Sequence, residues 1–357
     1  MVEILYDIPL APFTTLNLGG KAAYLARCHN EQEVLESLQF AKLKGLPVWI
    51  LGGGSNTIVS DSGFKGIVIK IEIMGMENLT KENSDVSTMS IGAGVNWDTF
   101  VLKSIEEGLA GIECLSGIPG TIGASPIQNI GAYGQEVANS IESVRMITPD
   151  FELVEVKAID CHFSYRNSKF KSGEWKNHII TSVKFNLSKT KSPCTNYPEV
   201  NKNWQSLALL VGRKFDRLTE FLEFRNLILS LRKSKSMVLD KEDPNSKSVG
   251  SFFTNPLLSQ EETKIFLNRV IELGLEKPSL YPDSDNKNKV SAAWLIEKSG
   301  IEKGLKYKGV GISSAHCLAL VNHNGTSSEL LELSDLVRLK VFEKFQINLI
   351  REPVFLS

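Results

Sequence analysis

Apolar residues recur at helical spacing in several segments of the chain, and three of these segments open with a capping signal. A Ser, Thr or Asn followed three residues later by Glu can satisfy backbone N–H groups at a helix start. The three pairs are Asn30 with Glu33, Ser259 with Glu262, and Thr326 with Glu329. A helix is therefore predicted after each cap, and Gly45 is predicted to end the first one. Two more helices are predicted, one with an apolar face from Trp97 to Ile105 and one over residues 220–231.

Short apolar runs bounded by turn residues predict strands between these helices. The candidate strands cover residues 47–51, 67–71, 90–95, 152–156, 179–187 and 347–356. Residues 188–216 are polar and irregular and are predicted to form a long loop or an insertion. The charged, turn-rich residues 233–248 are predicted to join two domains. The mixture of helices and strands indicates an α+β protein, and its 357 residues indicate two or three domains.

Composition is that of a globular protein, and it excludes several classes of function. Lys and Arg number 40 against 41 Asp and Glu, so no net field would attract nucleic acid or an anionic membrane. The five cysteines form no CxxC pair and the five histidines lack metal-site spacing, so we expect reduced thiols and no metal. Neither a signal peptide nor an apolar stretch near ~18 residues is visible. We therefore expect a cytoplasmic protein without a membrane or nucleic-acid partner.

The first segment with chemical potential is the glycine-rich run after the strand at 47–51. Three consecutive glycines allow a tight turn and bring bare backbone N–H groups close to a phosphate. The run consists of Leu51, Gly52, Gly53, Gly54, Ser55 and Asn56. A plain turn between two strands would explain the same residues. The run matches neither GxGxxG nor the P-loop motif, so a Rossmann dinucleotide site is not supported and a P-loop kinase is excluded.

A second glycine-rich run covers residues 117–134 and mixes five glycines and two prolines with isoleucines. A flexible linker would not need these apolar residues. The pattern favours a rigid, partly buried loop with exposed amides. Two such loops in one region suit a cofactor bridged by a pyrophosphate.

These two runs, LGGGSN and SGIPGTIGASPIQNIGAYG, resemble the FAD-binding domain of the UDP-N-acetylenolpyruvoylglucosamine reductases. That domain has the vanillyl-alcohol-oxidase-like fold. Further motifs follow in the family's order, namely FSYRNS at 163–168, GSFFTNP at 250–256, SAAWLIE at 291–297 and LIREP at 349–353. The resemblance extends from about residue 10 to the end. It implies an α+β fold whose FAD-binding part comprises residues 1–70, completed by a strand at 346–357, and residues 71–225, with a C-terminal substrate-binding domain at 232–345.

FAD is the cofactor that the resemblance implies, and both glycine-rich runs are expected to contact it. The expected contacts are Leu51, Gly52, Gly53, Gly54, Ser55, Asn56, Gly117, Ile118, Pro119, Gly120, Gly123, Ala124, Ser125 and Ile127.

The family reduces the enolpyruvyl double bond of UDP-N-acetylglucosamine enolpyruvate to give UDP-N-acetylmuramate for peptidoglycan, with NADPH as co-substrate. Hydride from reduced flavin adds to C3, and negative charge builds at C2 and its carboxylate as an enolate. Arg166 resembles the arginine that stabilises this enolate, and Ser251 resembles the proton donor to C2. Glu352 resembles the catalytic glutamate, which would help most if burial kept it protonated. The family usually has a Pro-Glu-Val-like context where this chain has Arg351-Glu352-Pro353-Val354.

Substrate contacts are expected from the same resemblance. Lys235 resembles the lysine that faces the diphosphate, with Lys233 as a rival for that role. The other expected substrate residues are Tyr165, Gln128, Tyr197 and Asn255. Tyr197 lies in the long polar segment and resembles the mobile tyrosine that covers the substrate in one subtype of the family.

The resemblance also implies that NADPH and the UDP-sugar use one site in turn by a ping-pong scheme, and we expect a monomer. Two other functions fit part of the sequence. One is an FAD oxidase that reduces oxygen with electrons from a hydroxy acid, and the other is a flavin-binding or nucleotide-sensing protein without activity. The GSFFTNP motif argues against the first, and intact Arg166, Ser251 and Glu352 argue against the second.

Overall fold

The computed structural model describes residues 2–211, 215–283 and 286–357, and the chain divides into two compact units. The first unit comprises Met1–Ile8, Ala22–Gly54 and Lys65–Val238, and the second comprises Pro9–Lys21, Ser55–Phe64 and Leu239–Ser357. The finer division into three domains stays a prediction. Within the described ranges, no helix is long and apolar enough to span a bilayer.

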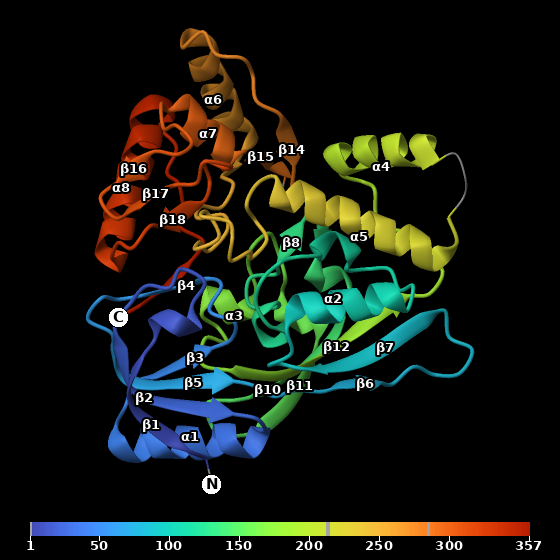
Figure 1. Ribbon diagram of the computed structural model, residues 1–357, viewed down its shortest axis with the longest axis vertical. Helices are drawn as coiled ribbons and strands as arrows, with labels where there is room; N and C mark the ends of the chain where they lie inside the picture. The colour runs from blue at the N-terminus through green and yellow to red at the C-terminus, as the bar shows by residue number, and fades with distance from the viewer. Residues whose placement is uncertain (1, 212–214, 284–285) are drawn as a thin grey trace. The chain divides into compact units, whose positions relative to one another are not determined.

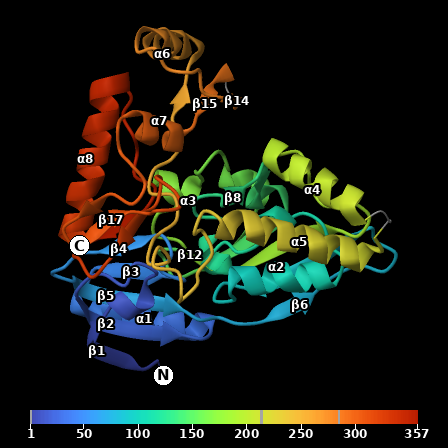
Figure 2. The same cartoon turned by 45° about the horizontal axis from the view of Figure 1, so that its top comes forward.

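The first unit begins with a four-stranded sheet that is covered by one helix (Figures 1 and 2). Its strand order is β1 (Ile4–Pro9), β2 (Lys21–Cys28), β5 (Phe64–Ile71), β3 (Val48–Leu51). The helix is α1 (Glu31–Lys44), which Asn30 caps by accepting from the backbone N–H of Glu33 and which Gly45 ends in the left-handed conformation. The predicted start and end of this helix are confirmed. Because β3 and β5 run parallel, the first glycine-rich run leaves the sheet at the carboxyl end of β3.

A five-stranded antiparallel sheet forms the second layer of this unit. Its strand order is β11 (Leu153–Lys157), β10 (Ile141–Ile147), β12 (Ile179–Ser188), β7 (Val86–Gly92), β6 (Met76–Asn78). Helix α2 (Trp97–Glu106) lies over β12 and β7, and α5 (Arg217–Lys233) packs on α2 (Figure 1). Trp97, Phe100 and Phe185 are fully buried and join α2 to β12, with 4.9 Å between the two phenylalanine rings. Short elements β8 (Gly131–Ala132), β9 (Gln135–Glu136) and α3 (Lys169–Ser172) complete it.

The prediction of an irregular segment over residues 188–216 is wrong for its middle part. Residues Pro198–Val211 form helix α4, which packs on α5, while residues 212–214 lie outside the described part of the chain. Val200 is fully buried, and the ring of Trp204 lies 5.3 Å from that of Phe224 on α5. Positions 201–203 are polar, but Val200, Trp204 and Leu207 recur at helical spacing. The segment therefore carries an amphipathic helical pattern, and packing on α5 stabilises it.

The second unit packs three helices against short strands. The helices are α6 (Gln260–Glu272), α7 (Ala292–Lys298) and α8 (Ser327–Phe345). The strands are β4 (Thr57–Val59), β13 (Leu257–Leu258), β14 (Leu280–Pro282), β15 (Asn288–Val290), β16 (Lys306–Tyr307), β17 (Val310–Ile312), β18 (Leu320–Asn322) and β19 (Val354–Leu356). Ser259 and Thr326 form complete capping boxes at α6 and α8, as predicted. The apolar stripe of α8, Leu330, Leu333, Val337 and Val341, is fully buried.

The strand predicted at 347–356 is wrong for most of its length, because only Val354–Leu356 forms a strand. This strand, β19, pairs in parallel with β4. Before it, Arg351 makes a single antiparallel bridge to Phe253. Pro353 has no N–H to donate, which interrupts a continuous ladder between Arg351 and Val354.

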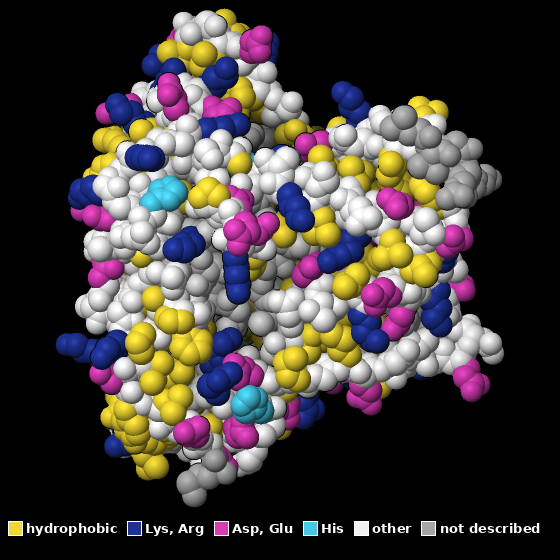
Figure 3. Space-filling model, viewed as in Figure 1, with side chains coloured by type: hydrophobic (Ala, Val, Ile, Leu, Met, Phe, Trp, Pro, Cys, Tyr) yellow, Lys and Arg dark blue, Asp and Glu magenta, His cyan; other side chains and the backbone are white. Residues whose placement is uncertain are grey.

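Acidic and basic side chains are intermixed on the face shown in Figure 3. All five cysteines are free thiols. Among the residues that the structure describes, no group of three or more His, Cys, Asp or Glu side chains could bind a metal ion.

Candidate active site

The two glycine-rich runs meet backbone to backbone in the first unit. A Cβ atom on Gly53 would lie 2.7 Å from the Cα of Gly120, and one on Gly52 would lie 2.7 Å from Oγ1 of Thr121. Any larger residue at either position would have to displace the facing backbone or hydroxyl. Glycine is therefore required where the runs touch, and the backbones of the two loops pack directly against each other.

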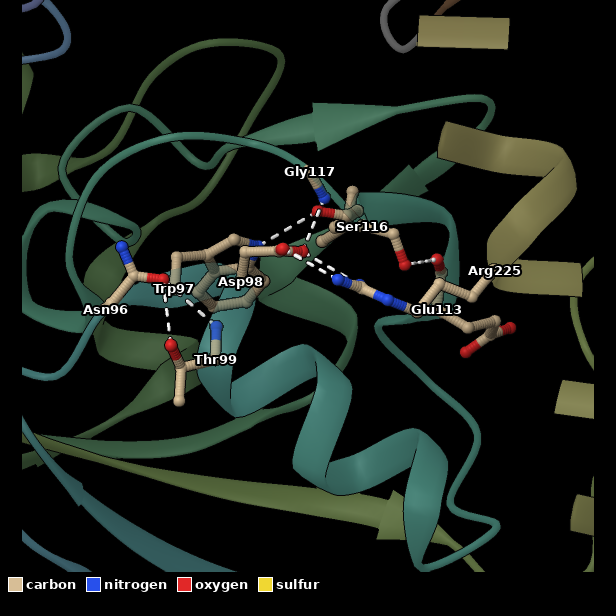
Figure 4. A network of polar contacts seen from close by, with 9 residues as sticks. Asn96, Trp97, Asp98, Thr99, Glu113, Ser116, Gly117 and Arg225 are labelled. Atoms are coloured by element: carbon tan, nitrogen blue, oxygen red, sulfur yellow. Dashed lines mark hydrogen bonds and ion pairs between the residues drawn. The ribbon is translucent and has the colours of Figure 1, made fainter. Parts of the chain in front are cut away.

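Polar contacts from neighbouring elements fix both runs in place, and Figure 4 shows those at the start of the second run. Lys70 on β5 donates from Nζ to the carbonyl oxygen of Gly52 at 2.6 Å. Asp98 on α2 accepts from the N–H of Gly117 at 2.5 Å and from both terminal nitrogens of Arg225 at 2.8 and 2.7 Å. Burial alone would raise the pKa of Asp98, but the bonds from Arg225 and Gly117 outweigh it and lower the pKa below its usual value. The start of the second run is thus tied to α2 and α5 by a charged, partly buried cluster.

A buried hydroxyl without a partner marks the point where the runs meet. Oγ1 of Thr121 is buried and has no hydrogen-bond partner among the described residues. A buried hydroxyl that is left unsatisfied costs free energy, so such a group usually has an external partner. The half-buried Lys70 adds a cation beside Gly52, and its pKa is lowered by burial. These donors fit the pyrophosphate-bridged cofactor FAD.

The other predicted FAD residues either pack within the loops or take part in hydrogen bonds that hold the loops in place. Leu51 is buried at the end of β3, and the Ala124 side chain is 3.4 Å from a Cβ built on Gly52. Ser125 is buried and donates to the carbonyl of Ile122, and the carbonyl of Ile127 accepts from Ser168. The positions with positive φ or close packing are Gly54, Gly117, Gly120 and Gly123. Ile118 packs on the core, and Pro119 precedes Gly120.

Ser55 and Asn56, the last residues of the first run, belong to the second unit. The Nδ2 of Asn56 donates to the carbonyl of Glu352 at 3.3 Å, and its own carbonyl accepts from the N–H of Val354. Asn56 therefore positions the C-terminal segment that carries Glu352.

Arg166 lies beside the second glycine-rich run. It has a positive φ of 52° and donates to the carbonyl oxygen of Gly131 at 2.7 Å. Asn129 ties its segment to the run, because Nδ2 of Asn129 donates to the carbonyl of Ser164 at 3.1 Å. The guanidinium carbon stands 5.4 Å from the ring centre of Tyr165. Arg166 and Tyr165 therefore lie next to the glycine-rich run. Gln128, which belongs to this run, accepts a hydrogen bond from Nζ of Lys171 at 3.5 Å.

Tyr197 and Lys235 are brought together around Tyr133. The Tyr197 and Tyr133 rings are 5.5 Å apart, and Nζ of Lys235 lies 5.7 Å from the centre of the Tyr133 ring. Lys235 is paired with Glu199 on α4 at 2.9 Å. Its rival Lys233 is an exposed residue at the end of α5. The helix that was predicted as a loop thus supplies the ion-pair partner of a predicted substrate residue.

Arg232 is a candidate residue that sequence reasoning missed. Its Nη2 donates to the carbonyl of Met237 at 2.8 Å, while its Nε is buried without a partner among the described residues. Burial lowers the pKa of this guanidinium, and the nearby Arg166 contributes in the same direction. A Cβ on Gly117 would lie 3.5 Å from this Nε. Two cations next to one glycine-rich run favour an anionic ligand, and the position of Arg232 three residues before Lys235 was the available signal.

Ser251 and Glu352 lie on two segments of the second unit whose backbones pair. The N–H of Glu352 donates to the carbonyl of Phe252 at 2.9 Å, and Thr254 donates to Ile350 at 3.0 Å. Phe252 is fully buried, which fixes the adjacent Ser251, and the Glu352 side chain is itself buried. Asn255, four residues after Ser251, accepts from the N–H of Ala292 at the start of α7.

The three predicted catalytic residues therefore come from two units. Ser251 and Glu352 lie on paired segments of the second unit, and Arg166 lies in the first. Each unit positions its own residues through contacts within that unit.

Two family models match this chain. Residues 22–157 match the FAD binding domain, and residues 243–356 match the C-terminal domain of UDP-N-acetylenolpyruvoylglucosamine reductase. The first matched range contains β3, Lys70 and most of both glycine-rich runs, and the second contains Ser251 and Glu352. The α+β organisation as an FAD-binding domain and a C-terminal domain is confirmed.

Relatives match along nearly the whole chain. The UDP-N-acetylenolpyruvoylglucosamine reductase of Thermobifida fusca (strain YX) is 41% identical over 356 residues, which covers 98% of this chain and 97% of that protein. The enzyme of the same name from Streptomyces avermitilis is 40% identical over 359 residues, with 99% and 95% covered. The crystal structure of the reductase from Thermus caldophilus has the same fold, with a TM-score of 0.64 at 23% identity, and the match covers 100% of this chain and 99% of that one. On these matches, this chain belongs to the UDP-N-acetylenolpyruvoylglucosamine reductase family of flavin-dependent oxidoreductases.

Proposed function

We propose that the chain reduces UDP-N-acetylglucosamine enolpyruvate to UDP-N-acetylmuramate with electrons from NADPH. The observation that supports this proposal is the backbone pairing of the GSFF and REP segments, which carry Ser251 and Glu352 in the second unit. An oxidase with the same FAD-binding domain would not need this pair. FAD, when bound, would supply the hydride for C3 of the enolpyruvyl group. Its phosphates would be held by the amides of the glycine-rich runs, by Thr121 and by Lys70.

Arg166 is proposed to stabilise the enolate that forms when hydride reaches C3. Its guanidinium is permanently charged, and its terminal nitrogens donate to the carbonyl oxygens of Asn129 and Gly131, which orients the group beside the run. The positive φ of this residue and the bond from Asn129 to Ser164 fix its backbone. A donor fixed before the reaction stabilises developing charge without a cost of reorganisation.

Ser251 is proposed to deliver the proton to C2, with Glu352 beside it. A serine hydroxyl is a weak acid, so it needs a dry site and charge-stabilising neighbours. The buried Phe252 and Phe253 exclude water from one side of Ser251. The buried carboxyl group of Glu352, if protonated, can donate a hydrogen bond to the enolate carboxylate.

Substrate binding is proposed to use residues that the first unit gathers around Tyr133. Lys235 would exchange part of its ion pair with Glu199 for a diphosphate oxygen, and Arg232 would offer its unpaired Nε to an anionic group. Tyr197, 5.5 Å from Tyr133, would cover the bound substrate. In the second unit, Asn255 would contact the nucleotide. We further propose that NADPH and the substrate bind in turn by a ping-pong scheme. The protein is proposed to be a monomer that acts in peptidoglycan synthesis in the cytoplasm.

An anaerobic two-step experiment tests the reaction. Purified protein with FAD is first mixed with NADPH, which should bleach the visible flavin band. The enolpyruvyl substrate is then added, and the band should return without oxygen as UDP-N-acetylmuramate forms. Flavin that stays reduced until oxygen enters would contradict the proposal and favour the oxidase alternative.

A further inference from the structure

Two of the five cysteines come together in the first unit although 80 positions separate them in the sequence. The Sγ of Cys114 donates a hydrogen bond to the carbonyl oxygen of Cys194 at 3.3 Å. Cys114 is fully buried and Cys194 is partly exposed. Both belong to a small apolar cluster that includes Tyr133 and Tyr197. The other three thiols are buried elsewhere, so this pair is the natural place for a cross-link.

One buried acid fixes both cysteine backbones. The N–H of Cys194 donates to Oε1 of Glu113 at 2.8 Å, and the N–H of Cys114 donates to Oε1 of Gln135 at 2.9 Å. Gln135 in turn donates to Oε1 of Glu113 at 3.2 Å, and Glu113 (labelled in Figure 4) also accepts from Gly111 at 2.6 Å. The two backbones therefore share one network, which keeps the thiols in contact and limits the movement that bond formation would require.

We propose that Cys114 and Cys194 form a reversible disulfide under oxidants of the hydroperoxide class, and that this bond restrains the segment carrying Tyr197. Cys194 is three residues before Tyr197 and four before the start of α4. Cys114 lies in the short 3-10 helix Glu113–Leu115, directly before the second glycine-rich run. A covalent bond between them would fasten a segment expected to move over substrate to the loop expected to bind FAD. The effect on turnover rests on the proposed function, whereas formation of the bond does not.

The chemistry balances with hydrogen peroxide as the oxidant. The Cys194 thiolate attacks one peroxide oxygen, the O–O bond breaks, and the departing hydroxide takes up a proton to give water. The Cys114 sulfur then attacks the Cys194 sulfenic acid, the S–O bond breaks, and the second water leaves with the Cys114 proton. The two cysteines lose two electrons and the peroxide gains two. The neighbouring Cys114 side chain lowers the pKa of the Cys194 thiol to about 6, and this partly exposed residue is therefore the attacking group.

Peptide mapping of the full-length FAD-loaded protein tests the bond directly. Reduced protein is treated with hydrogen peroxide, alkylated, digested without reductant and analysed by mass spectrometry. A linked pair of peptides containing Cys114 and Cys194, which dithiothreitol separates, is the expected result. Cys194→Ser should abolish it, and Cys161→Ser, which removes a buried thiol of the same unit, should leave it intact. Irreversible oxidation of Cys194 without a link, or links to other cysteines, would overturn the proposal.

Hydrogen exchange and turnover test the restraint. Amides of residues 195–207 should exchange about tenfold more slowly in the oxidised protein than in the reduced one, with no change in the Cys194→Ser variant. Turnover of the enolpyruvyl substrate should fall about tenfold on oxidation and recover with dithiothreitol. If the disulfide forms but the amides of residues 195–207 exchange at an unchanged rate, the proposed restraint is refuted. A reduced protein that shows no turnover would refute the proposed function instead, while mapping and exchange would still decide the disulfide.

Discussion

At the scale of single residues, Ser251 has the most specific role in the account. Ser251→Ala should leave FAD binding and flavin reduction by NADPH unchanged and lower turnover of the enolpyruvyl substrate about a thousandfold, because only the proton donor is lost. Stopped-flow spectra of the two half-reactions measure this directly. Ser259→Ala is the matched control in the same unit, since it removes the α6 cap and should cost about 1 kcal/mol of stability without changing turnover. Near-normal turnover by Ser251→Ala would remove Ser251 from its role.

Arg166 is expected to act through its geometry as well as its charge. Arg166→Lys keeps the charge but loses the planar fork, so we expect kcat to fall about a hundredfold with a smaller change in KM. Arg145→Lys is a suitable control, because Arg145 forms an exposed pair with Glu31 in the same unit. If both variants kept wild-type kcat, enolate stabilisation would have to come from another group.

The side-chain hydroxyl of Thr121 is expected to contact FAD, and its removal tests the proposed cofactor site. Thr121→Val replaces the buried, unpartnered hydroxyl by a methyl group of similar size and should weaken FAD binding about tenfold if the hydroxyl contacts the cofactor. Fluorescence titration of the apoprotein with FAD measures the Kd. Thr99→Val alters an exposed hydroxyl on α2 and serves as the control. Unchanged or tighter FAD binding by Thr121→Val would show that the hydroxyl faces no polar cofactor group.

At the scale of elements, the cluster of Asp98 and Arg225 ties α2 and α5 to the second glycine-rich run. Asp98→Asn leaves the buried Arg225 without its charge partner and should destabilise the protein by about 3 kcal/mol, measured by urea unfolding. Glu107→Gln breaks an exposed pair with Lys103 on the same helix and should cost less than about 0.5 kcal/mol. Similar losses in both variants would mean that the cluster does not stabilise the run.

The same cluster predicts a direction for the pH dependence of stability. Because the pKa of Asp98 is lowered in the folded state, its contribution is fully present above about pH 4 and is lost as the pH falls through the folded value. The wild type should therefore lose more stability than Asp98→Asn as the pH falls below about 4, where the unfolded carboxyl group begins to bind protons. Parallel curves for the two proteins would contradict this assignment.

Local signals in the sequence predicted some elements well and others poorly. The caps at Asn30, Ser259 and Thr326 were predictable because a cap depends on residues three positions apart. Helix α4 was missed because the polar residues around Val200 and Trp204 obscured the helical spacing of Val200, Trp204 and Leu207. The length of the C-terminal strand was overestimated, because the apolar residues begin at Ile347 whereas β19 begins only after Pro353, which has no N–H to donate.

The candidate site shows the same division. The glycine-rich runs could be identified from residue types alone, because close backbone approach requires glycine, whereas the GSFF motif was identified by its resemblance to the family. The side chains that hold these runs in place could not be identified from the sequence, because Lys70, Asp98 and Arg232 come from other segments of the chain. Nothing in the local sequence of Cys114 or Cys194 indicated that one glutamate would bring them together.

At the scale of the whole molecule, the account assigns FAD binding to the first unit and proton delivery to the second. Variants of Thr121 and Lys70 in the first unit should alter FAD affinity, and variants of Ser251 and Glu352 in the second should alter reoxidation by substrate. Arg166 and the proposed substrate residues Tyr197, Arg232 and Lys235 also lie in the first unit, but their variants are expected to affect the second half-reaction.

The most direct test is the isotopic outcome of the anaerobic second half-reaction. The reduced enzyme is mixed with the enolpyruvyl substrate in deuterium oxide, and the product is analysed by NMR. The account predicts one solvent deuterium at C2 in a single configuration for the wild type, and loss of flavin reoxidation for Ser251→Ala. Deuterium at C2 in both configurations, or rapid reoxidation by the variant, would contradict proton delivery by Ser251.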